Sequence, residues 1–211
     1  MYNPKHFEER DIGVIHALIK AHPLSTWVTL ADGALVANHI PFLVDPSRGE
    51  FGTLVGHVAR ANPVWKSFSR DVPSILVFQG PEGYISPSFY ASKREHGKVV
   101  PTWNYAVVHA YGTPRVIDDP AWLRGHVTAM TDLQESRHPP GEWKVSDAPS
   151  DFIDGMVKMI VGIEIPVARV EGKWKMSQNR ATADRAGTVA GLNERGDAEM
   201  AGLVEEYSAK A

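Results

Sequence analysis

The sequence of 211 residues contains no cysteine. This absence excludes disulfide bonds, thiolate metal centres and cysteine nucleophiles. No apolar run approaches the roughly 20 residues that a membrane span requires, and the first residues, MYNPKHFEER, lack the apolar core of a signal peptide. The sequence therefore predicts a soluble, cytoplasmic protein. Its apolar content of 43% is enough for one domain with its own core.

The sequence also lacks a large excess of charge of one sign, because it has 22 basic and 25 acidic side chains. No global field would attract nucleic acid or an anionic membrane. Glycine-rich nucleotide loops between a strand and a helix are absent, and so is the GxSxG nucleophile motif. None of the nine histidines forms an i, i+4 pair around a carboxylate. Neither a protein metal site nor covalent catalysis is expected.

Short strands joined by turns dominate the expected secondary structure. Asp32-Gly33 tolerates positive φ and predicts a tight hairpin between strands at 24–30 and 34–44. Further strands are expected at 51–56, 74–79, 84–86, 103–117 and 159–176, and helices at 12–22, 62–68, 119–135 and 150–158. Segment 137–149 is expected to be irregular, and two short C-terminal helices to meet at 193–197.

This alternation favours a mostly β fold with some α structure and argues against βαβ layering. We expect an antiparallel barrel with flanking helices over residues 1–180, and a helical extension of the same domain over residues 181–211. A closed barrel would also remove exposed strand edges.

The stretch GHVARANP, residues 56–63, places polar side chains before a predicted helix start. A helix N-terminus offers unpaired N–H groups and a partial positive charge, which suit a phosphate. Arg60 adds a guanidinium that can bind two phosphate oxygens, His57 adds a tunable donor, and Asn62 can cap the helix or bind the ligand. The alternative interpretation is a capped helix with two ordinary surface residues.

Residues 86–105, SPSFYASKREHGKVVPTWNY, include a loop of about sixteen residues, a length at which connections are often functional. Trp103 can cover a flat heteroaromatic ligand, while Thr102 and Asn104 can bind its polar edge. The alternative is an ordinary long loop held by its aromatic side chains.

In GKWKMSQNR, strand alternation places Lys173 and Lys175 on one face, next to the polar residues Ser177, Gln178 and Asn179. Two like charges on one face usually point to solvent or to an anion. A solvated edge strand that resists aggregation is the alternative interpretation.

Six phrases of the sequence resemble the PaiB family, bacterial proteins described as FMN-binding negative transcriptional regulators. The phrases are MYNPKHF, GHVARANP, GPEGYISPSFYASK, VPTWNYAVVHAYG, IVGIEI and EGKWKMSQNR. They occur in this order and extend from the first residue past Arg180, over most of the chain. Phe89 departs from the pattern, since the family often has tryptophan there.

The resemblance implies an antiparallel split β-barrel of the FMN-binding type, acting as a homodimer with the flavin at the subunit interface. By position, His57, Arg60 and Asn62 would hold the FMN phosphate. The ring would lie near Lys93 and residues Pro101, Thr102, Trp103 and Asn104. The segment from Lys173 to Asn179, with Lys175, Ser177 and Gln178, would close the site from the same or the partner subunit. A lysine there would stabilise the anionic reduced flavin.

Three functions are open on this basis. One is a flavin-linked negative regulator of transcription, although neither the net charge nor a recognised motif supports DNA binding. The second is an enzyme, either a flavin-dependent oxidoreductase or a relative of split-barrel haem-degrading proteins, for which the sequence identifies no catalytic residues. The third is a ligand-binding barrel without turnover.

Overall fold

The computed structural model describes residues 1–137 and 143–210, and the chain divides into two compact units. Unit 1 is built from Met1–Leu18, Gln79–His109 and Glu171–Ala211, and unit 2 from Ile19–Phe78 and Ala110–Val170. Each unit therefore combines segments that lie far apart in the sequence. Part of the segment predicted to be irregular, residues 138–142, lies outside the described residues.

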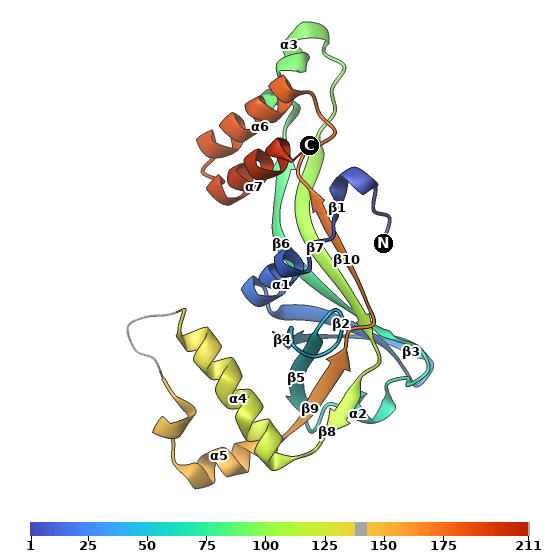
Figure 1. Cartoon of the computed structure of the whole chain (residues 1–211), viewed down its shortest axis with the longest axis vertical. Coiled ribbons are helices and arrows are strands. Elements are labelled where there is room, and N and C mark those ends of the chain that lie inside the picture. Colours follow the sequence, from blue (N-terminus) through green and yellow to red (C-terminus); the bar gives the residue numbers. More distant parts are fainter. Residues whose placement is uncertain (138–142, 211) are drawn as a thin grey trace. The chain divides into compact units, whose positions relative to one another are not determined.

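The strands of the described residues form two sheets (Figure 1). The larger sheet contains β1 (Glu8–Glu9), β2 (Leu24–Ala31), β3 (Ala34–Pro41), β6 (Ser74–Ile85), β7 (Thr102–Gly112) and β10 (Arg169–Lys175), in the order β1-β10-β7-β6-β2-β3. The smaller sheet contains β4 (Leu43–Asp45), β5 (Thr53–Ala59), β8 (Arg115–Ile117) and β9 (Ile160–Pro166), in the order β4-β5-β9-β8.

The pairing within these sheets is antiparallel at every step of the smaller sheet and at β1–β10, β2–β3 and β2–β6 of the larger one. The predicted antiparallel class with flanking helices is therefore confirmed. The expectation of one closed barrel is wrong, because the strands form two sheets that are not closed. The architecture is that of a split barrel.

The hairpin between β2 and β3 forms as predicted from local sequence. Ala31 pairs with Ala34, so the loop has two residues, and Asp32 and Gly33 adopt φ angles of 49° and 80°. Positive φ at both positions matches the twist of the flanking strands. Alternate residues of β2 are buried, and Trp27 is fully buried against the rings of Phe42 and Phe68.

Three strands that the sequence predicts as continuous are each divided between the two sheets. The breaks fall at residue 42, residues 113–114 and residues 167–168. At the first break, the Phe42 N–H donates to the Pro23 carbonyl at 2.9 Å and the ring is fully buried. Gly56 of β5 leaves room for this ring, since a Cβ there would lie 2.8 Å from Phe42 Cδ1. The alternation of apolar and polar residues along a strand does not indicate where the chain leaves one sheet and enters the other.

The helices of unit 1 agree with the predicted ones except in the long loop. Helix α1 (Ile12–Ala21), whose last residues belong to unit 2, is capped by Asp11, and α6 (Thr182–Glu194) and α7 (Ala198–Ala209) form the expected C-terminal pair (Figure 1). The predicted loop instead contains a 3-10 turn at Pro87–Phe89 and a short helix α3 (Ala91–His96). The prediction of separate strands at 74–79 and 84–86 is wrong, because β6 continues through Gly80 to Ile85. Gly80 instead allows close packing, since a Cβ there would lie 2.8 Å from Leu18 Cδ1 of α1.

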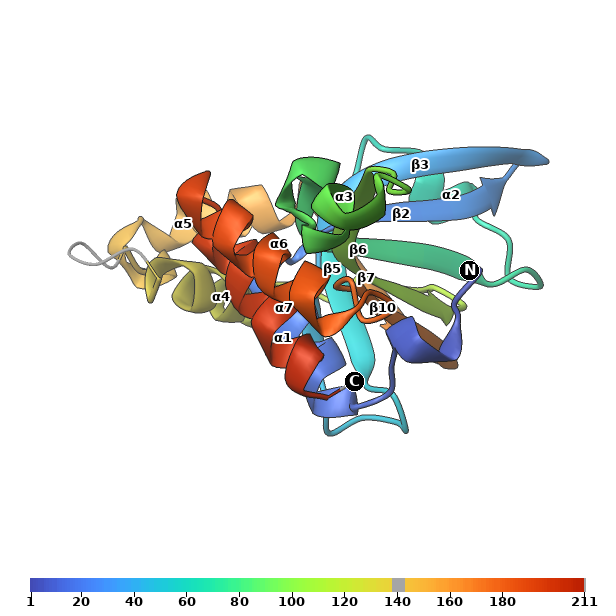
Figure 2. The same ribbon diagram turned by 90° about the horizontal axis from the view of Figure 1, so that it is seen from above.

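Unit 2 contains α2 (Val64–Ser67), α4 (Pro120–Glu135), α5 (Ser150–Val157) and a 3-10 turn at Val145–Asp147. Helices α4 and α5 are in contact, and their yellow and gold ribbons lie side by side in Figure 1 and Figure 2. Asp119 caps α4 by accepting the Trp122 N–H at 2.9 Å, as the sequence predicts. Apolar side chains of both helices and the 3-10 turn form a small core with Leu123 and Ile153. Gly162 of β9 lets Trp122 pack closely, since a Cβ would lie 2.4 Å from its ring.

No helix within the described ranges combines the length and the apolar composition needed to cross a bilayer.

Candidate functional site

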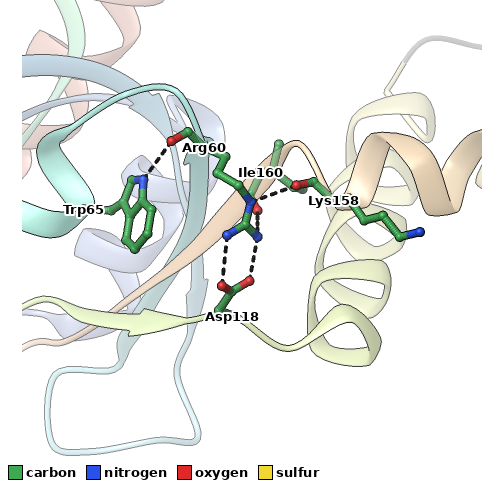
Figure 3. A network of polar contacts seen from close by, with 5 residues as sticks. All are labelled: Arg60, Trp65, Asp118, Lys158 and Ile160. Carbon is green, nitrogen blue, oxygen red and sulfur yellow. Dashed lines mark hydrogen bonds and ion pairs between the residues drawn. The ribbon is translucent and has the colours of Figure 1, made fainter.

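The predicted phosphate residues lie in unit 2, around the end of β5. This strand runs to Ala59 and not to Gly56 as expected, so His57 lies inside the strand and Arg60 directly follows it. Figure 3 shows the Arg60 guanidinium facing the Asp118 carboxylate. Nη1 and Nη2 donate to its two oxygens at 2.9 and 2.6 Å, while Nε and Nη2 also donate to the carbonyls of Lys158 and Ile160 at 2.8 and 2.9 Å.

These contacts use four of the five N–H groups of Arg60. The hydrogen bond from Arg60 lowers the pKa of the Asp118 carboxyl. Arg60 therefore links the end of β5 to the start of β9 at Ile160 and to Asp118, which precedes α4. It also contacts Lys158, directly after α5. A phosphate that bound this guanidinium through two N–H groups would have to displace Asp118 from it, because one N–H group remains unused.

The helix α2 begins at Val64 with Pro63 as its N-cap, one residue later than the sequence predicts, and Asn62 precedes that cap. The Oδ1 of Asn62 accepts the Val64 N–H at 3.0 Å, and its Nδ2 donates to Asn38 Oδ1 at 2.8 Å. The helix behind this cap is a single turn of four residues. Both polar atoms of Asn62 are thus engaged within unit 2.

His57 faces α4, where sequence reasoning did not anticipate a partner. Its Nδ1 lies 3.1 Å from Nε2 of His126, and the His126 ring stacks on Trp122 at an interplanar angle of 14°. Burial and the neighbouring charge of His57 lower the pKa of His126 to about 4, and burial lowers the pKa of His57. Both rings are neutral at pH 7. Trp122 and His126 are four residues apart in α4, and residues at this spacing lie on the same face of a helix. This spacing is the sequence signal that could have predicted that this face of α4 is buried.

A second group of predicted residues meets in unit 1, where β7 and β10 lie in one sheet. The ammonium of Lys175 donates to Thr102 Oγ1 and, at 2.6 Å, to the carbonyl of Trp103. Lys173 is only 7% exposed and donates to the Tyr2 carbonyl at 3.0 Å. Both ammonium groups lie over the Tyr105 ring, at 5.3 and 5.9 Å, which confirms that the two lysines share a face.

Arg180 joins these lysines, and we call Lys173, Lys175 and Arg180 the cationic cluster. Burial, followed by the positive charges of Lys173 and Arg180, lowers the pKa of Lys175. The ion pairs formed among the described residues include none of the three cations. Arg180 has an acidic neighbour in Asp184: against the effect of burial, hydrogen bonds from Ser92 and then the charge of Arg180 lower the pKa of that carboxyl. The two lysines repel each other and donate to neutral acceptors, an arrangement that favours an added anion. Arg180 stands in the quoted SQNR phrase but was not singled out from the sequence.

An exposed aromatic pair adjoins this cluster. Trp103, whose carbonyl accepts from Lys175, is 53% exposed and meets Tyr84 edge to face at 5.9 Å. Tyr84 is 41% exposed. Two large rings that remain half in solvent offer a surface for a flat ligand. Lys93 lies exposed on α3 of the same unit.

The remaining predicted residues hold the turn after β10. Asn104 and Ser177 are buried and hydrogen-bond to each other at 3.0 Å. Ser177 has a φ of 65°, a left-handed conformation that is uncommon outside glycine. Gln178 accepts the Met176 N–H at 2.7 Å and donates to the Trp174 carbonyl at 2.7 Å. These side chains shape the turn between Lys175 at the end of β10 and Arg180.

Comparison with known proteins gives matches over most of the chain. The sequence profile of the family described as "Putative FMN-binding domain" matches residues 1–169. The Bacillus subtilis protein named Protease synthase and sporulation protein PAI 2 is 30% identical over 210 residues, covering 98% of this chain and 97% of that protein. An uncharacterised protein of Emericella nidulans is 32% identical over 222 residues, with 89% and 88% covered.

Two solved structures share the fold at low sequence identity. The flavocytochrome Anf3 from Azotobacter vinelandii superposes with a TM-score of 0.56 at 14% identity, covering 80% of this chain and 69% of that chain. The FAD and haem binding protein from Mycobacterium smegmatis gives 0.56 at 16% identity, with 85% and 78% covered. The split-barrel class is therefore shared with these two proteins.

Proposed function

Because the chain belongs to the PaiB-type family of FMN-binding domains, we propose that it binds flavin mononucleotide and that the cationic cluster contacts the bound flavin. The observation that carries this proposal is the cationic cluster beside the exposed rings of Tyr84 and Trp103. Within it, Lys173 and Lys175 form no ion pair among the described residues. This donor set fits a flat, anionic ligand. The flavin would supply the redox chemistry, and the chain its binding and electrostatic environment.

Within this site, Lys175 is the residue best suited to respond to the ligand. Its ammonium is held by neutral acceptors, Thr102 Oγ1 and the Trp103 carbonyl, and its pKa is lowered by burial and by the charges of Lys173 and Arg180. A nearby anion would raise that pKa again, because it stabilises the charged form. Lys175 and Lys173 would therefore favour an anionic flavin over a neutral one.

The phosphate subsite remains a separate part of the proposal. Sequence position assigns the phosphate to His57, Arg60 and Asn62, and the Asp118 carboxylate competes with it for the Arg60 guanidinium. Removing the competing carboxylate with Asp118→Asn would then strengthen FMN binding, while Arg60→Gln would weaken it by about tenfold or more, the scale of a lost charge-assisted bond. Neither variant would change the affinity for riboflavin, which lacks the phosphate.

Calorimetric titration with FMN and riboflavin in parallel tests both parts. FMN binding by the unaltered chain supports the cofactor, and its absence refutes it. If FMN binds but both Asp118→Asn and Arg60→Gln leave its affinity unchanged, the phosphate lies elsewhere and the cofactor proposal survives. Retained melting temperatures would show that the variants are folded.

We further propose that the protein forms a cytoplasmic homodimer with flavin at the subunit interface, and that it acts as a negative regulator of transcription. Support comes from the relationship to the Bacillus subtilis protein PAI 2 over nearly the whole of both chains. Sedimentation with and without FMN tests the dimer. Salt-sensitive binding to promoter DNA would support direct regulation, whereas NAD(P)H oxidation with added FMN would favour the oxidoreductase alternative.

A further inference from the structure

Unit 2 contains a cavity of about 220 Å³ between α4, α5 and the smaller sheet, separate from the cationic cluster of unit 1. Its walls are mostly apolar. The side chains used in the argument below are Val127 and Thr131 of α4, Ile153 and Met156 of α5, Trp143, and His57 of β5. The small core around Leu123 and Ile153 leaves this space unfilled.

From this cavity we infer a second ligand site, for a small uncharged molecule that has an apolar body and one hydrogen-bond acceptor directed at His57. His57 would then serve this site and not the FMN phosphate, which leaves Arg60 and Asn62 for the phosphate. The volume is below the roughly 300 to 1,000 Å³ of typical ligand pockets, which favours a small ligand. The described residues that line the cavity include no lysine, arginine, aspartate or glutamate. A charged ligand would be buried there without a counterion, which is costly.

The polar end of the ligand follows from the histidine pair. One proton occupies the 3.1 Å contact between His57 Nδ1 and His126 Nε2, and either ring can carry it. His126 is 6% exposed, and its Nδ1 is buried without a partner in the described structure. If His57 donated, His126 Nδ1 would have to carry a buried, unpaired N–H group.

Buried N–H groups without an acceptor are rarer than acceptors without a donor. His126 Nε2–H therefore donates to His57 Nδ1, and His57 carries its own proton on Nε2. Because His57 Nδ1 faces His126 and the His57 side chain lines the cavity, we assign the Nε2–H group as the donor to the ligand. His126 thus acts as a positioning residue that makes His57 a donor, and the ligand's matching group is a carbonyl, ether or hydroxyl oxygen. No third metal-ligating side chain joins the pair among the described residues.

Three probes of similar size test the inference on the full chain: acetophenone, ethylbenzene, which lacks the carbonyl, and benzoate, which is charged. The readout is the shift of the Trp143 indole N–H in ¹H–¹⁵N spectra, assigned with Trp143→Phe. We expect acetophenone to bind about five- to tenfold more tightly than ethylbenzene, the scale of one hydrogen bond, and benzoate to bind more weakly than both. Equal affinities for the first two, or tighter binding of benzoate, would overturn the inference.

Variants locate the site and the tautomer. Val127→Phe fills the cavity and should abolish the acetophenone shifts, while Ala129→Phe adds the same ring to an exposed position of α4 and should leave them intact. His126→Phe should remove the preference for acetophenone and leave ethylbenzene binding unchanged. The ¹⁵N shifts of the unaltered chain provide a measurement that needs no variant, and a protonated Nδ1 on His57 would refute the donor assignment.

Discussion

Acidification should destabilise this fold through His126. Its pKa is about 4 in the folded protein against an ordinary value of 6.5. Between these two pH values the unfolded chain binds more protons than the folded one. The contribution of His126 to the unfolding free energy is therefore fully present above about pH 6.5 and decreases as the pH falls. At about 1.4 kcal/mol per pH unit, the loss attributable to His126 between pH 7.5 and pH 5 is about 2 kcal/mol, and it levels off below pH 4.

The assay is urea unfolding of the wild type and of His126→Phe at pH 7.5 and pH 5. Phenylalanine keeps an aromatic ring for stacking on Trp122 but cannot be protonated. Other groups that titrate in this range contribute to the pH dependence of both proteins. One of them is His57, because burial lowers its pKa as well. The difference between the two pH dependences therefore isolates His126. If both proteins lose the same stability on acidification, His126 is not buried in its neutral form and the reasoning is wrong.

Three further predictions concern the candidate flavin site and the packing around it. Lys175→Met should weaken FMN binding by about tenfold in calorimetric titration, whereas Lys20→Met, at an exposed position of α1, should change it little. Equal losses in the two variants would show that only net charge matters. Gly162→Ala should lower the unfolding free energy by about 1 to 3 kcal/mol because its Cβ would overlap the Trp122 ring, and an unchanged urea midpoint would contradict the close packing. Asn104→Ala should cost about 1 to 3 kcal/mol by leaving a buried hydroxyl unpaired, and a stability equal to wild type would mean that water replaces the amide.

The elements that sequence predicts well are those fixed by contacts within a few residues. Asp32 and Gly33 specify a two-residue turn through their own φ preferences. Asp119 caps α4 through an N–H three residues away, and the two-residue period of a strand places Lys173 and Lys175 on one face over Tyr105. The relationship to the FMN-binding family, carried by phrases along the chain, is also visible in the sequence.

The partners of the predicted phosphate residues could not be predicted from neighbouring residues in the sequence. Arg60 pairs with Asp118, which lies 58 residues away, and His57 meets His126 across 69 residues. The GHVARANP phrase is the same whether its arginine faces a phosphate or a carboxylate. The choice between these partners depends on how α4 packs against β5 and β9, and no local pattern contains that information.

The sequence by itself determined the antiparallel class, the caps, the hairpin and the like-charged lysine face, because each depends on backbone preference or side-chain period over a few neighbouring residues. Only the tertiary structure decided where strands change sheet, as at the buried Phe42, and which side chains are neutralised by distant partners. It left Lys173, Lys175 and Arg180 outside the ion pairs of the described residues, while pairing Arg60 with Asp118 near the surface. The physical reason is that burial and long-range charge pairing are properties of the packed chain.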